Sequence, residues 1–452
     1  MNNIFKPILD DDRSRILVEC FDRKIYAVGG AVRDCILGRK FKDIDYTIGL
    51  HPDEILKILT EKGYRVIPTG NSHQTVTVVL GENIQPLEVT SFRNSEMRSE
   101  GGVFLGESIE EDLKFRDFTC NSLAVDLQTG VLIDVLNSVE DIKKRLLKGN
   151  IDAAQRFKED PLRILRMIRI ASELNFSIDD STFAQGIALA PLLKNVSMER
   201  IRDEFSKIIV TEKVEFGLEK LREISFFDLF FPELKVCVGF EQNKFHSKDV
   251  YYHTIDVLEL SKPTLLNRLA ALLHDIGKPD SLTVDEGGDR HFYLHEKIGA
   301  EMVEPILKRF MYSKNIIKSV ERLVYTHMRP IDAGAGGLRR ILRDTEPNYL
   351  EWRDLKQADT IAVLGDGVKI KNEFADFDNR IHEILNSPTG SVFKNLAVNG
   401  LDLKELKIKE GPIYKEILKY CQELVIDNPS LNTKSQLIEA IRIRFLAKKS
   451  NL

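Results

Sequence analysis

The sequence predicts an α+β protein, in which a mixed α/β head is followed by a long all-helical body. Short apolar runs bounded by Gly, Pro and Asn alternate with helical pieces up to about residue 140. Beyond about residue 150 the strand pattern disappears, and apolar residues recur at three- and four-residue spacing. The length of 452 residues is too great for one ordinary domain. We therefore predict a head at 1–148, a helical neck at 149–232, a helical domain at 233–385 and a helical tail at 386–452.

The head is predicted from six strand-like runs and two helical ones. Strands are expected in IYAVGG, DIDYTIG, TVTVVL, PLEVTSF, LAVDL and VLIDVL, and helices in AVRDCILG and PDEILKILTEKG. A polar, glycine-containing loop from Asn94 to Ser108 interrupts the sheet.

The body is predicted from helical periodicity in RILRMIRIASEL, ERIRDEFSKII, NRLAALLHDIG and LKELKI. Breaks near Phe231-Pro232, from Asp285 to Asp289 and from Ser387 to Gly390 divide this body into its parts.

The composition of the chain restricts the classes of protein to which it can belong. Hydrophobic residues make up 43% of the chain and charged residues 30%, which is ordinary for a chain that buries a core. The N-terminus lacks the pattern of a signal peptide, and no apolar run approaches the ~20 residues needed to cross a bilayer. The five cysteines are scattered without a CxxC pair. We expect a cytoplasmic protein with reduced thiols and no membrane partner.

The net charge of −5 does not by itself suggest a nucleic-acid partner, but basic residues are concentrated locally. One such stretch runs from Lys143 to Arg169 and a second from Lys308 to Arg343. Local basic surface is what holds a phosphate backbone. A single basic run is more often a solvated helix face.

A phosphate site is predicted in YAVGGAVRD. Gly29-Gly30 lets the backbone approach a bulky anion, and the helix that follows directs its N-terminal amides and dipole towards it. Arg33, one turn into this helix, can donate to phosphate oxygens through its planar guanidinium. A Gly-Gly turn alone is usually only a tight turn.

Paired carboxylates follow at Asp43 and Asp45. Residues two apart in a strand point to the same face, so both side chains are expected to project together. Their mutual repulsion is relieved if a cation lies between them, and Mg²⁺ prefers carboxylate and phosphate oxygens. Glu88 is a candidate third carboxylate. We therefore predict a Mg²⁺ site with Asp43, Asp45 and Glu88 as the catalytic carboxylates.

In order along the chain, four segments resemble one family. GGAVRD followed by DID, FRDFTCNSLA (115–124), EDPLRILR (159–166) and ERIRDEFSKII (199–209) are similar to motifs of class II tRNA nucleotidyltransferases and poly(A) polymerases. The resemblance implies a polymerase-beta-like nucleotidyltransferase head and a neck that reads the nucleobase and binds RNA. It implies an enzyme that adds CCA to the 3′ end of tRNA from CTP and ATP and releases pyrophosphate.

The resemblance also implies residue roles. The loop Gly29-Gly30, Arg33 and Asp34 would hold the triphosphate, and Arg116, Asp117 and Asn121 would lie near the ribose. Asp160 and Arg163 would read the base edge, because a carboxylate accepts from an exocyclic amine and a guanidinium donates to ring acceptors. Arg166 would contact phosphate or position other groups. Asp160 before Pro161 is also a good helix N-cap, and both roles can coexist.

Two departures from the family pattern stand out. Phe115 replaces the first of two paired arginines. The loop at 94–107 is shorter than usual and lacks the aspartate-to-arginine pattern of CCA-adding members. A reduced loop is associated in the family with enzymes that add only CC. An alternative is therefore a CC-adding enzyme that needs a separate A-adding enzyme as partner.

A second metal site is predicted in the helical domain. Tyr252-His253, then LHDIGK with His274 and Asp275, then Asp359 resemble an HD phosphohydrolase domain, and His295 and His327 lie where larger HD sites have further ligands. Imidazole and carboxylate together suit divalent metals, whose identity stays open here. Individually, His295 and His327 are more often core residues.

Further readings stay open on the sequence alone. The first is a poly(A) polymerase. The second is a metal-dependent HD phosphohydrolase acting on RNA ends, with an inherited head. The third is a non-catalytic RNA-binding protein, which the intact catalytic residue types disfavour.

Overall fold

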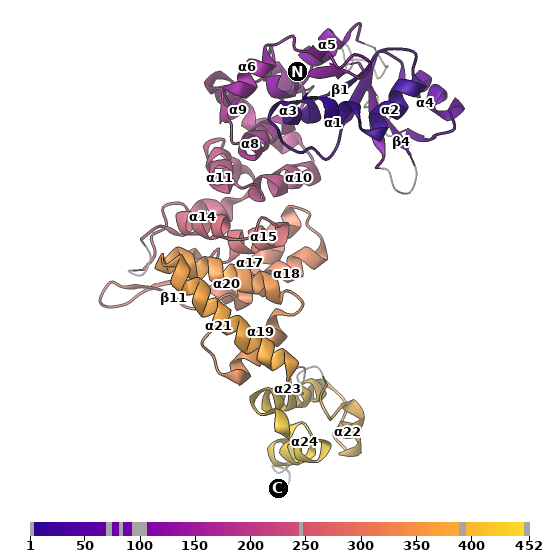
Figure 1. The fold of residues 1–452 in the computed structure, drawn as a ribbon. Helices are drawn as coiled ribbons and strands as arrows, with labels where there is room; N and C mark the ends of the chain where they lie inside the picture. The colour runs from indigo at the N-terminus through magenta and orange to yellow at the C-terminus, as the bar shows by residue number, and fades with distance from the viewer. Residues whose placement is uncertain are drawn as a thin grey trace. The chain divides into compact units, whose positions relative to one another are not determined.

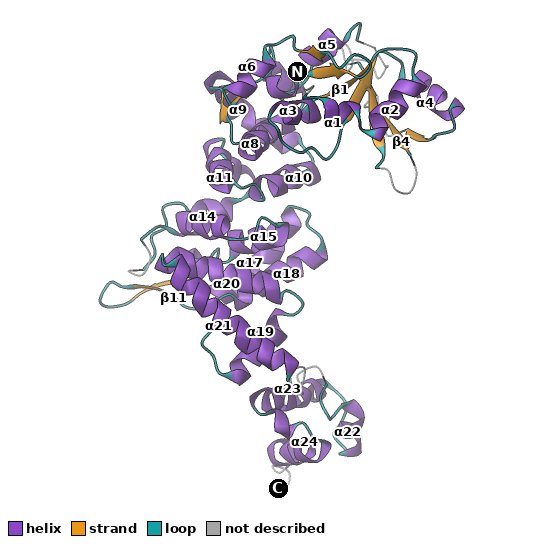
Figure 2. Cartoon of the chain, viewed as in Figure 1, coloured by secondary structure: helices purple, strands orange, loops and turns teal. Residues whose placement is uncertain are grey.

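The computed structural model describes residues 4–68, 75–80, 85–92, 106–243, 247–387 and 395–446 (Figure 1). The chain forms two compact units, Met1–Leu229 and Phe230–Leu452. The first contains a sheet with helices and a helical segment, and the second is almost entirely helical (Figure 2).

A seven-stranded mixed sheet is the centre of the first unit. Its order is β3-β4-β5-β2-β1-β6-β7, and β2 and β5 are parallel whereas the other neighbours are antiparallel. The strands are β1 (Ile25–Val28), β2 (Asp45–Ile48), β3 (Arg65–Pro68), β4 (Thr75–Val79), β5 (Leu87–Ser91), β6 (Ala124–Asp126) and β7 (Leu132–Ile133). All four residues of β1 are buried, as expected for an apolar strand between two neighbours.

Short helices connect and cover these strands. They are α1 (Lys6–Leu9), α2 (Asp12–Cys20), α3 (Gly30–Ile36), α4 (Pro52–Glu61), α5 (Ile109–Lys114) and α6 (Ser138–Lys143). Local sequence determines where α4 begins: His51 caps it in a reciprocal box with Glu54, and Pro52 occupies the first turn.

Helices α7 to α12 complete the first unit. They are α7 (Ala153–Glu159), α8 (Leu162–Leu174), α9 (Asp180–Leu189), α10 (Met198–Ile209), α11 (Val214–Glu223) and α12 (Phe226–Phe230), with a small parallel pair of β8 (Leu146–Leu147) and β9 (Ser177–Ile178). Helix α8 packs against α10 and α11, and it ends at Asn175 in the left-handed conformation.

The second unit continues with α13 and a largely helical domain. Its elements are α13 (Pro232–Cys237), α14 (Val250–Leu260), α15 (Leu265–Leu273), α16 (Lys278–Ser281), β10 (Leu282–Val284), β11 (Arg290–Phe292), α17 (His295–Arg309), α18 (Lys314–Thr326), α19 (Ala335–Thr345), α20 (Tyr349–Leu364) and α21 (Gly367–Asn386). The single tryptophan of the chain, Trp352, is fully buried in this unit.

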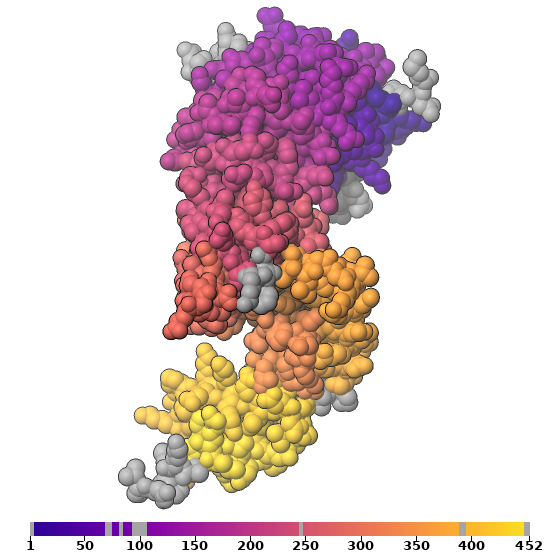
Figure 3. Space-filling view, turned by 90° about the vertical axis from the view of Figure 1, so that its left-hand side faces the viewer, coloured from indigo at the N-terminus to yellow at the C-terminus, as the bar shows by residue number. Residues whose placement is uncertain are grey.

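The last helices of this unit have their own small core. Helices α22 (Gly400–Glu405), α23 (Pro412–Asp427) and α24 (Lys434–Ile441) enclose a cluster that includes Leu403, Cys421 and Leu437. The segment that contains these three helices is drawn in yellow in Figure 3, and α23 packs against α19.

The second basic stretch is largely paired within the protein. Arg340 donates to Glu423 at 2.9 Å and to Asp427 at 2.8 Å, joining α19 to α23, and Arg343 also pairs with Glu423. Arg329 pairs with Asp344. Arg322 and Arg339 donate to backbone carbonyls, and Arg309 pairs with Glu233. These arginines therefore connect parts of the second unit through ion pairs and hydrogen bonds.

The predicted fold class is confirmed, with differences in detail. Strand β3 and the pairs β8–β9 and β10–β11 were not expected, because they are short and carry little alternation. The break predicted at Asp285–Asp289 is the turn of the β10–β11 hairpin, with Gly288 at φ +84°. No helix in the part of the chain described here is long and apolar enough to span a membrane.

Candidate active site

The predicted phosphate loop lies between the end of β1 and the start of α3. Gly29 has φ +75°, which a side chain rarely tolerates. A Cβ at this position would lie 3.4 Å from Nη1 of Arg116 and 3.8 Å from Oδ2 of Asp45. Glycine is therefore favoured by the backbone conformation, whereas a Cβ would make only ordinary van der Waals contact with this guanidinium and carboxylate.

The two predicted metal carboxylates flank a buried residue. Asp43 and Asp45 are exposed and Ile44 is buried, so the expected alternation holds although β2 begins only at Asp45. Asp45 lies opposite Glu88 in the parallel pair of β2 and β5, and Glu88 is also exposed. Among the described residues, groups of three or more metal-ligating side chains within 4.8 Å occur only in the helical body. A cation in the head would therefore need ligands beyond these side chains, and triphosphate oxygens are suitable ones.

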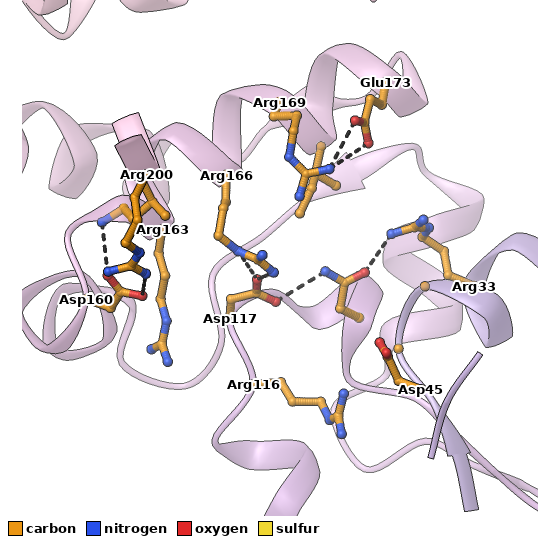
Figure 4. A pocket seen from close by; sticks show the side chains of 15 residues that line it. Arg33, Asp45, Arg116, Asp117, Asp160, Arg163, Arg166, Arg169, Glu173 and Arg200 are labelled. Carbon is orange, nitrogen blue, oxygen red and sulfur yellow. Dashed lines mark hydrogen bonds and ion pairs between the residues drawn. The ribbon is translucent and has the colours of Figure 1, made fainter. Parts of the chain in front are cut away.

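One cavity of about 480 Å³ joins the loop to the neck (Figure 4). It is lined by Gly29, Gly30, Arg33, Asp45, Arg116, Asp117, Asn121, Asp160, Leu162, Arg163, Arg166, Arg169, Ile170, Glu173 and Arg200. Ten of these were predicted as site residues. Of the other predicted ones, Asp43, Glu88 and Asp34 are not among the lining residues, and Asp34 instead accepts from Arg33 Nε at 3.0 Å.

A hydrogen-bonded chain of side chains crosses the floor of this cavity. Arg166 Nε donates to Asp117 at 3.0 Å, Asn121 donates to Asp117 at 3.2 Å, and Arg33 Nη1 donates to Asn121 at 2.6 Å (Figure 4). Burial opposes ionisation of Asp117, but Arg166 and Asn121 outweigh it and hold the pKa of this carboxyl well below its usual range. The charged carboxylate therefore fixes the Arg166 guanidinium and the Asn121 amide, and the amide oxygen of Asn121 in turn accepts from Arg33.

Arg116 is held from the opposite side. Its side chain is 9% exposed, and Nε and Nη2 donate to Asp112 at 3.0 and 2.9 Å. Asp112 is itself fully buried within α5. This fork fixes the guanidinium that faces Gly29.

The far end of the cavity contains the predicted base-reading pair. Asp160 Oδ1 accepts from the backbone of Leu162 at 3.4 Å, and Oδ2 accepts from Arg200 Nη2 at 2.9 Å. The N-cap of α8 is Pro161 rather than the expected Asp160. Asp160 makes one long hydrogen bond to the first residue of α8, and its second oxygen pairs with Arg200. Arg163 Nη1 donates to the Arg156 carbonyl at 3.3 Å.

Sequence reasoning assigned no role to Arg169, Glu173 or Arg200. Arg200 lies in the ERIRDEFSKII segment, which was identified as a motif without residue roles. Its pairing with Asp160 joins residues 40 positions apart and has no local signal. Arg169 donates to the buried Glu204 at 2.7 Å and to Glu173 at 3.0 Å.

In the helical domain the six predicted ligands come together. His253 is on α14, His274 and Asp275 follow α15, His295 begins α17, His327 follows α18, and Asp359 is on α20. They form two groups, His253 with His274 and Asp359, and Asp275 with His295 and His327. Asp275 lies between the groups: Oδ2 is 3.1 Å from His274 Nε2, and Oδ1 is 3.3 Å from His295 Nε2.

The chemistry of these side chains fits divalent metal. The Nδ1 atoms of His274, His295 and His327 lie 2.8, 2.8 and 2.7 Å from backbone carbonyls. Each Nδ1 therefore donates a proton to a carbonyl, so in the neutral form of the ring the Nε2 lone pair is directed into the cluster. Burial lowers the pKa of His327 to about 3, so this imidazole is neutral near pH 7, the form that binds metal.

Lys278 compensates the charge of Asp275. Burial alone would raise the pKa of Asp275, but His274 and Lys278 hold it well below its usual range. Lys278 Nζ lies 2.6 Å from Asp275 and 2.6 Å from the Gln242 amide oxygen. The two groups of metal-ligating side chains thus share the ionised carboxylate of Asp275.

Models of known families match three successive parts of the chain. A model described as "Poly A polymerase head domain" matches residues 25–148, one described as "Probable RNA and SrmB- binding site of polymerase A" matches 175–237, and an HD domain model matches 246–364. Nucleotidyltransferase heads and HD domains generally use divalent metals, in agreement with the donor sets described above.

Curated relatives match over different lengths. A protein named CCA-adding enzyme from Streptococcus sanguinis (strain SK36) is 39% identical over 214 residues, covering 46% of this chain and 52% of that protein. The chain thus matches about half the length of that relative. The protein of the same name from Streptococcus pneumoniae serotype 19F (strain G54) is 36% identical over 422 residues, covering 92% of each.

Solved structures share the fold over nearly the whole chain. The Bacillus stearothermophilus CCA-adding enzyme in complex with CTP superposes with a TM-score of 0.71 at 24% identity, covering 98% of this chain and 99% of that one. A CCA-adding enzyme in complex with ATP gives a TM-score of 0.61 at 19% identity, with 98% of each chain covered. Because it is 36% identical to the Streptococcus pneumoniae relative over 92% of each chain, this chain belongs to the CCA-adding enzyme family.

Proposed function

We propose that this protein adds CCA to the 3′ end of tRNA, using CTP and ATP and releasing pyrophosphate. The observation that carries the proposal is the single cavity that holds a phosphate loop at one end and Asp160 with Arg163 at the other. The two ends suit the triphosphate and the base of one nucleotide. The CCA-adding enzymes among its relatives and the nucleotide complexes of its structural neighbours support the same substrates.

The triphosphate end binds anions and a cation. Backbone amides at Gly29-Gly30 and the Arg33 guanidinium would contact phosphate oxygens. Asp43 and Asp45 would hold Mg²⁺, which supplies charge neutralisation to the reacting and leaving oxygens. In the reaction the RNA 3′ hydroxyl attacks the α-phosphorus, and the bond to the bridging oxygen of pyrophosphate breaks.

The base end discriminates by hydrogen bonds. The Asp160 carboxylate accepts from the exocyclic amine of cytosine or adenine, and the Arg163 guanidinium donates to ring acceptors. UTP presents a carbonyl where CTP presents an amine, so its oxygen would face a carboxylate. Arg116, Asp117 and Asn121 would contact or orient the ribose, and Arg166 positions Asp117.

Extension assays test this function. tRNA transcripts ending at the discriminator base, at C and at CC are incubated with Mg²⁺ and CTP, ATP or both. We expect completion to CCA from all three ends, and no ladder of added adenosines. A polyadenosine ladder on these transcripts would instead identify a poly(A) polymerase.

The same assay decides between CCA and CC addition. The CC-adding alternative rests on the loop 94–107, of which residues 94–105 lie outside the described part of the chain. A stop at CC, with no ATP incorporated on the CC-ending transcript, would identify a CC-adding enzyme that requires a separate A-adding partner.

The helical domain favours a second activity. Two groups of metal ligands around Asp275 suit activation of water for attack on a phosphate ester. We propose metal-dependent hydrolysis of 2′,3′-cyclic or 2′ phosphates at RNA ends. Release of phosphate or ring opening is measured with added divalent metals, and His274→Ala should abolish it while leaving CTP addition unchanged. Hydrolysis that persists in His274→Ala would refute this assignment.

A further inference from the structure

An aromatic side chain lies behind the predicted base-reading end of the cavity. Phe115, the residue after α5, has the guanidinium carbon of Arg156 at 5.1 Å from its ring centroid. A guanidinium at this distance over an aromatic face is attracted by the ring quadrupole. The contact joins the segment that carries Arg116 and Asp117 to helix α7.

Arg156 in turn holds Arg163 in two ways. Its Nη1 lies 2.9 Å from Glu159 Oε2, and the same carboxylate oxygen lies 3.6 Å from Arg163 Nη1. The backbone carbonyl of Arg156 accepts from Arg163 Nη1 at 3.3 Å. Both acceptors lie in the last turn of α7, where the helix dipole also favours a cation.

These side chains are shielded from water. The side chains of Arg156, Glu159 and Arg163 are 17%, 18% and 12% exposed. Solvent screening of their charges is therefore weak, and a change in one of them is transmitted to the others. Among the described residues that line the cavity, Arg163 is present but Phe115, Arg156 and Glu159 are not.

We propose that Phe115 is a positioning residue for nucleotide selection. Through Arg156 and Glu159 it holds the Arg163 guanidinium at the cavity, and so it sets the discrimination of CTP from UTP. The inference rests on the proposed function, and it assigns a role to a position where the family resemblance predicts arginine.

The chemistry explains why an aromatic residue suits this place. Two guanidiniums, those of Arg156 and Arg163, already share the Glu159 carboxylate. A third guanidinium at position 115 would repel Arg156, whereas a neutral ring attracts it. Phe115→Arg is therefore expected to be more damaging than Phe115→Leu.

Steady-state kinetics with full-length protein tests the role. Phe115→Leu should raise KM for CTP about fivefold and raise UTP incorporation relative to CTP about tenfold, with kcat within about twofold because the carboxylates of the phosphate end are untouched. Phe115→Tyr retains the ring face and should behave like the wild type. Phe183→Leu is the matched control, because Lys220 Nζ lies 4.4 Å from the Phe183 ring in a contact outside the cavity.

A double-mutant cycle tests the route. Arg156→Met keeps the backbone carbonyl but removes the guanidinium, so it should reproduce most of the effect of Phe115→Leu. Adding Phe115→Leu to Arg156→Met should then change KM and UTP misincorporation by less than twofold. If the two substitutions act independently, their fold-changes in KM and UTP misincorporation multiply in the double variant. That result would overturn the route through Arg156.

CTP binding without turnover separates this inference from the proposed function. The rise in melting temperature caused by CTP should be smaller in Phe115→Leu than in wild type and unchanged in Phe183→Leu. A wild-type protein that does not extend tRNA would refute the proposed function. Unchanged KM, selectivity and CTP-induced shift in Phe115→Leu would overturn the positioning role, even if that variant melts at a lower temperature.

Discussion

Replacing Asp117 by Asn removes the charge at the centre of the cavity floor while keeping the size of the side chain. Arg166 loses its anionic partner, and the new amide nitrogen presents a donor where either Arg166 or Asn121 also donates. Asn121, which donates to the same carboxylate at 3.2 Å, loses a charged acceptor as well. We expect both stability and nucleotide affinity to fall.

The magnitude follows from burial. Removing one partner of a buried ion pair costs roughly 3–5 kcal/mol. The Asp117 side chain is only 9% exposed, but that of Arg166 is 36% exposed, so water compensates part of the lost interaction. We expect Asp117→Asn to lower the free energy of unfolding of the first unit by about 2–3 kcal/mol, after this discount for solvent screening.

The effect should depend on pH in one direction. The folded pKa of Asp117 is lowered below that of the unfolded chain, which is about 3.9. The stabilisation is therefore fully present above about pH 5 and is lost as pH falls towards the folded pKa. The difference between wild type and Asp117→Asn should stay constant from pH 5 to pH 8 and shrink below about pH 4.

Denaturant unfolding followed by two signals measures this change. Trp352 is the only tryptophan and lies in the second unit, so its fluorescence reports on that unit, whereas far-UV circular dichroism reports on both. Asp53→Asn is the control, because the Asp53 side chain is 89% exposed. A loss in Asp117→Asn below about 0.5 kcal/mol, or a difference that already shrinks at pH 6, would refute the reasoning.

Three further predictions concern the two metal sites. Asp45→Asn should lower the rate of CTP addition by about 10²–10³-fold, an effect of the size expected for losing charge stabilisation of the transition state; Asp53→Asn should retain activity in the same primer-extension assay. His274→Ala should lower bound divalent metal, measured by elemental analysis of the purified protein, with CTP addition unaffected. Gly277→Ala should destabilise the second unit by about 1–3 kcal/mol, because a Cβ there would lie 2.4 Å from the His295 carbonyl oxygen. Gly367→Ala, whose Cβ would meet only a side-chain methyl at 3.8 Å, should change the tryptophan-monitored midpoint little.

The fold class was predictable because the spacing at which apolar residues recur is a strong signal of helix or strand. The apolar run of β1 and the alternation around Asp43, Ile44 and Asp45 follow directly from the order of residues. The hairpin of β10 and β11 was interpreted only as a break, because each strand has three residues and the turn between them is polar. Short strands carry too few alternations to differ from loops in sequence.

The candidate site was predictable where its residues form local motifs. Gly29, Arg33, Asp117 and Asp160 each belong to a short run with a recognisable pattern, and the structure places all four in one cavity. Arg200 was missed because its role arises only when α10 packs against α8, which brings it to Asp160. Such long-range pairing leaves no trace in spacing.

The pairing of arginines on α19 has a consequence for RNA affinity. Arg340 and Arg343 are already neutralised by Glu423 and Asp427 from α23. Residues of this kind release few condensed ions from RNA, because they would first have to give up partners within the protein. The affinity for tRNA should therefore decline with added salt less steeply than the number of basic residues between Lys308 and Arg343 would suggest.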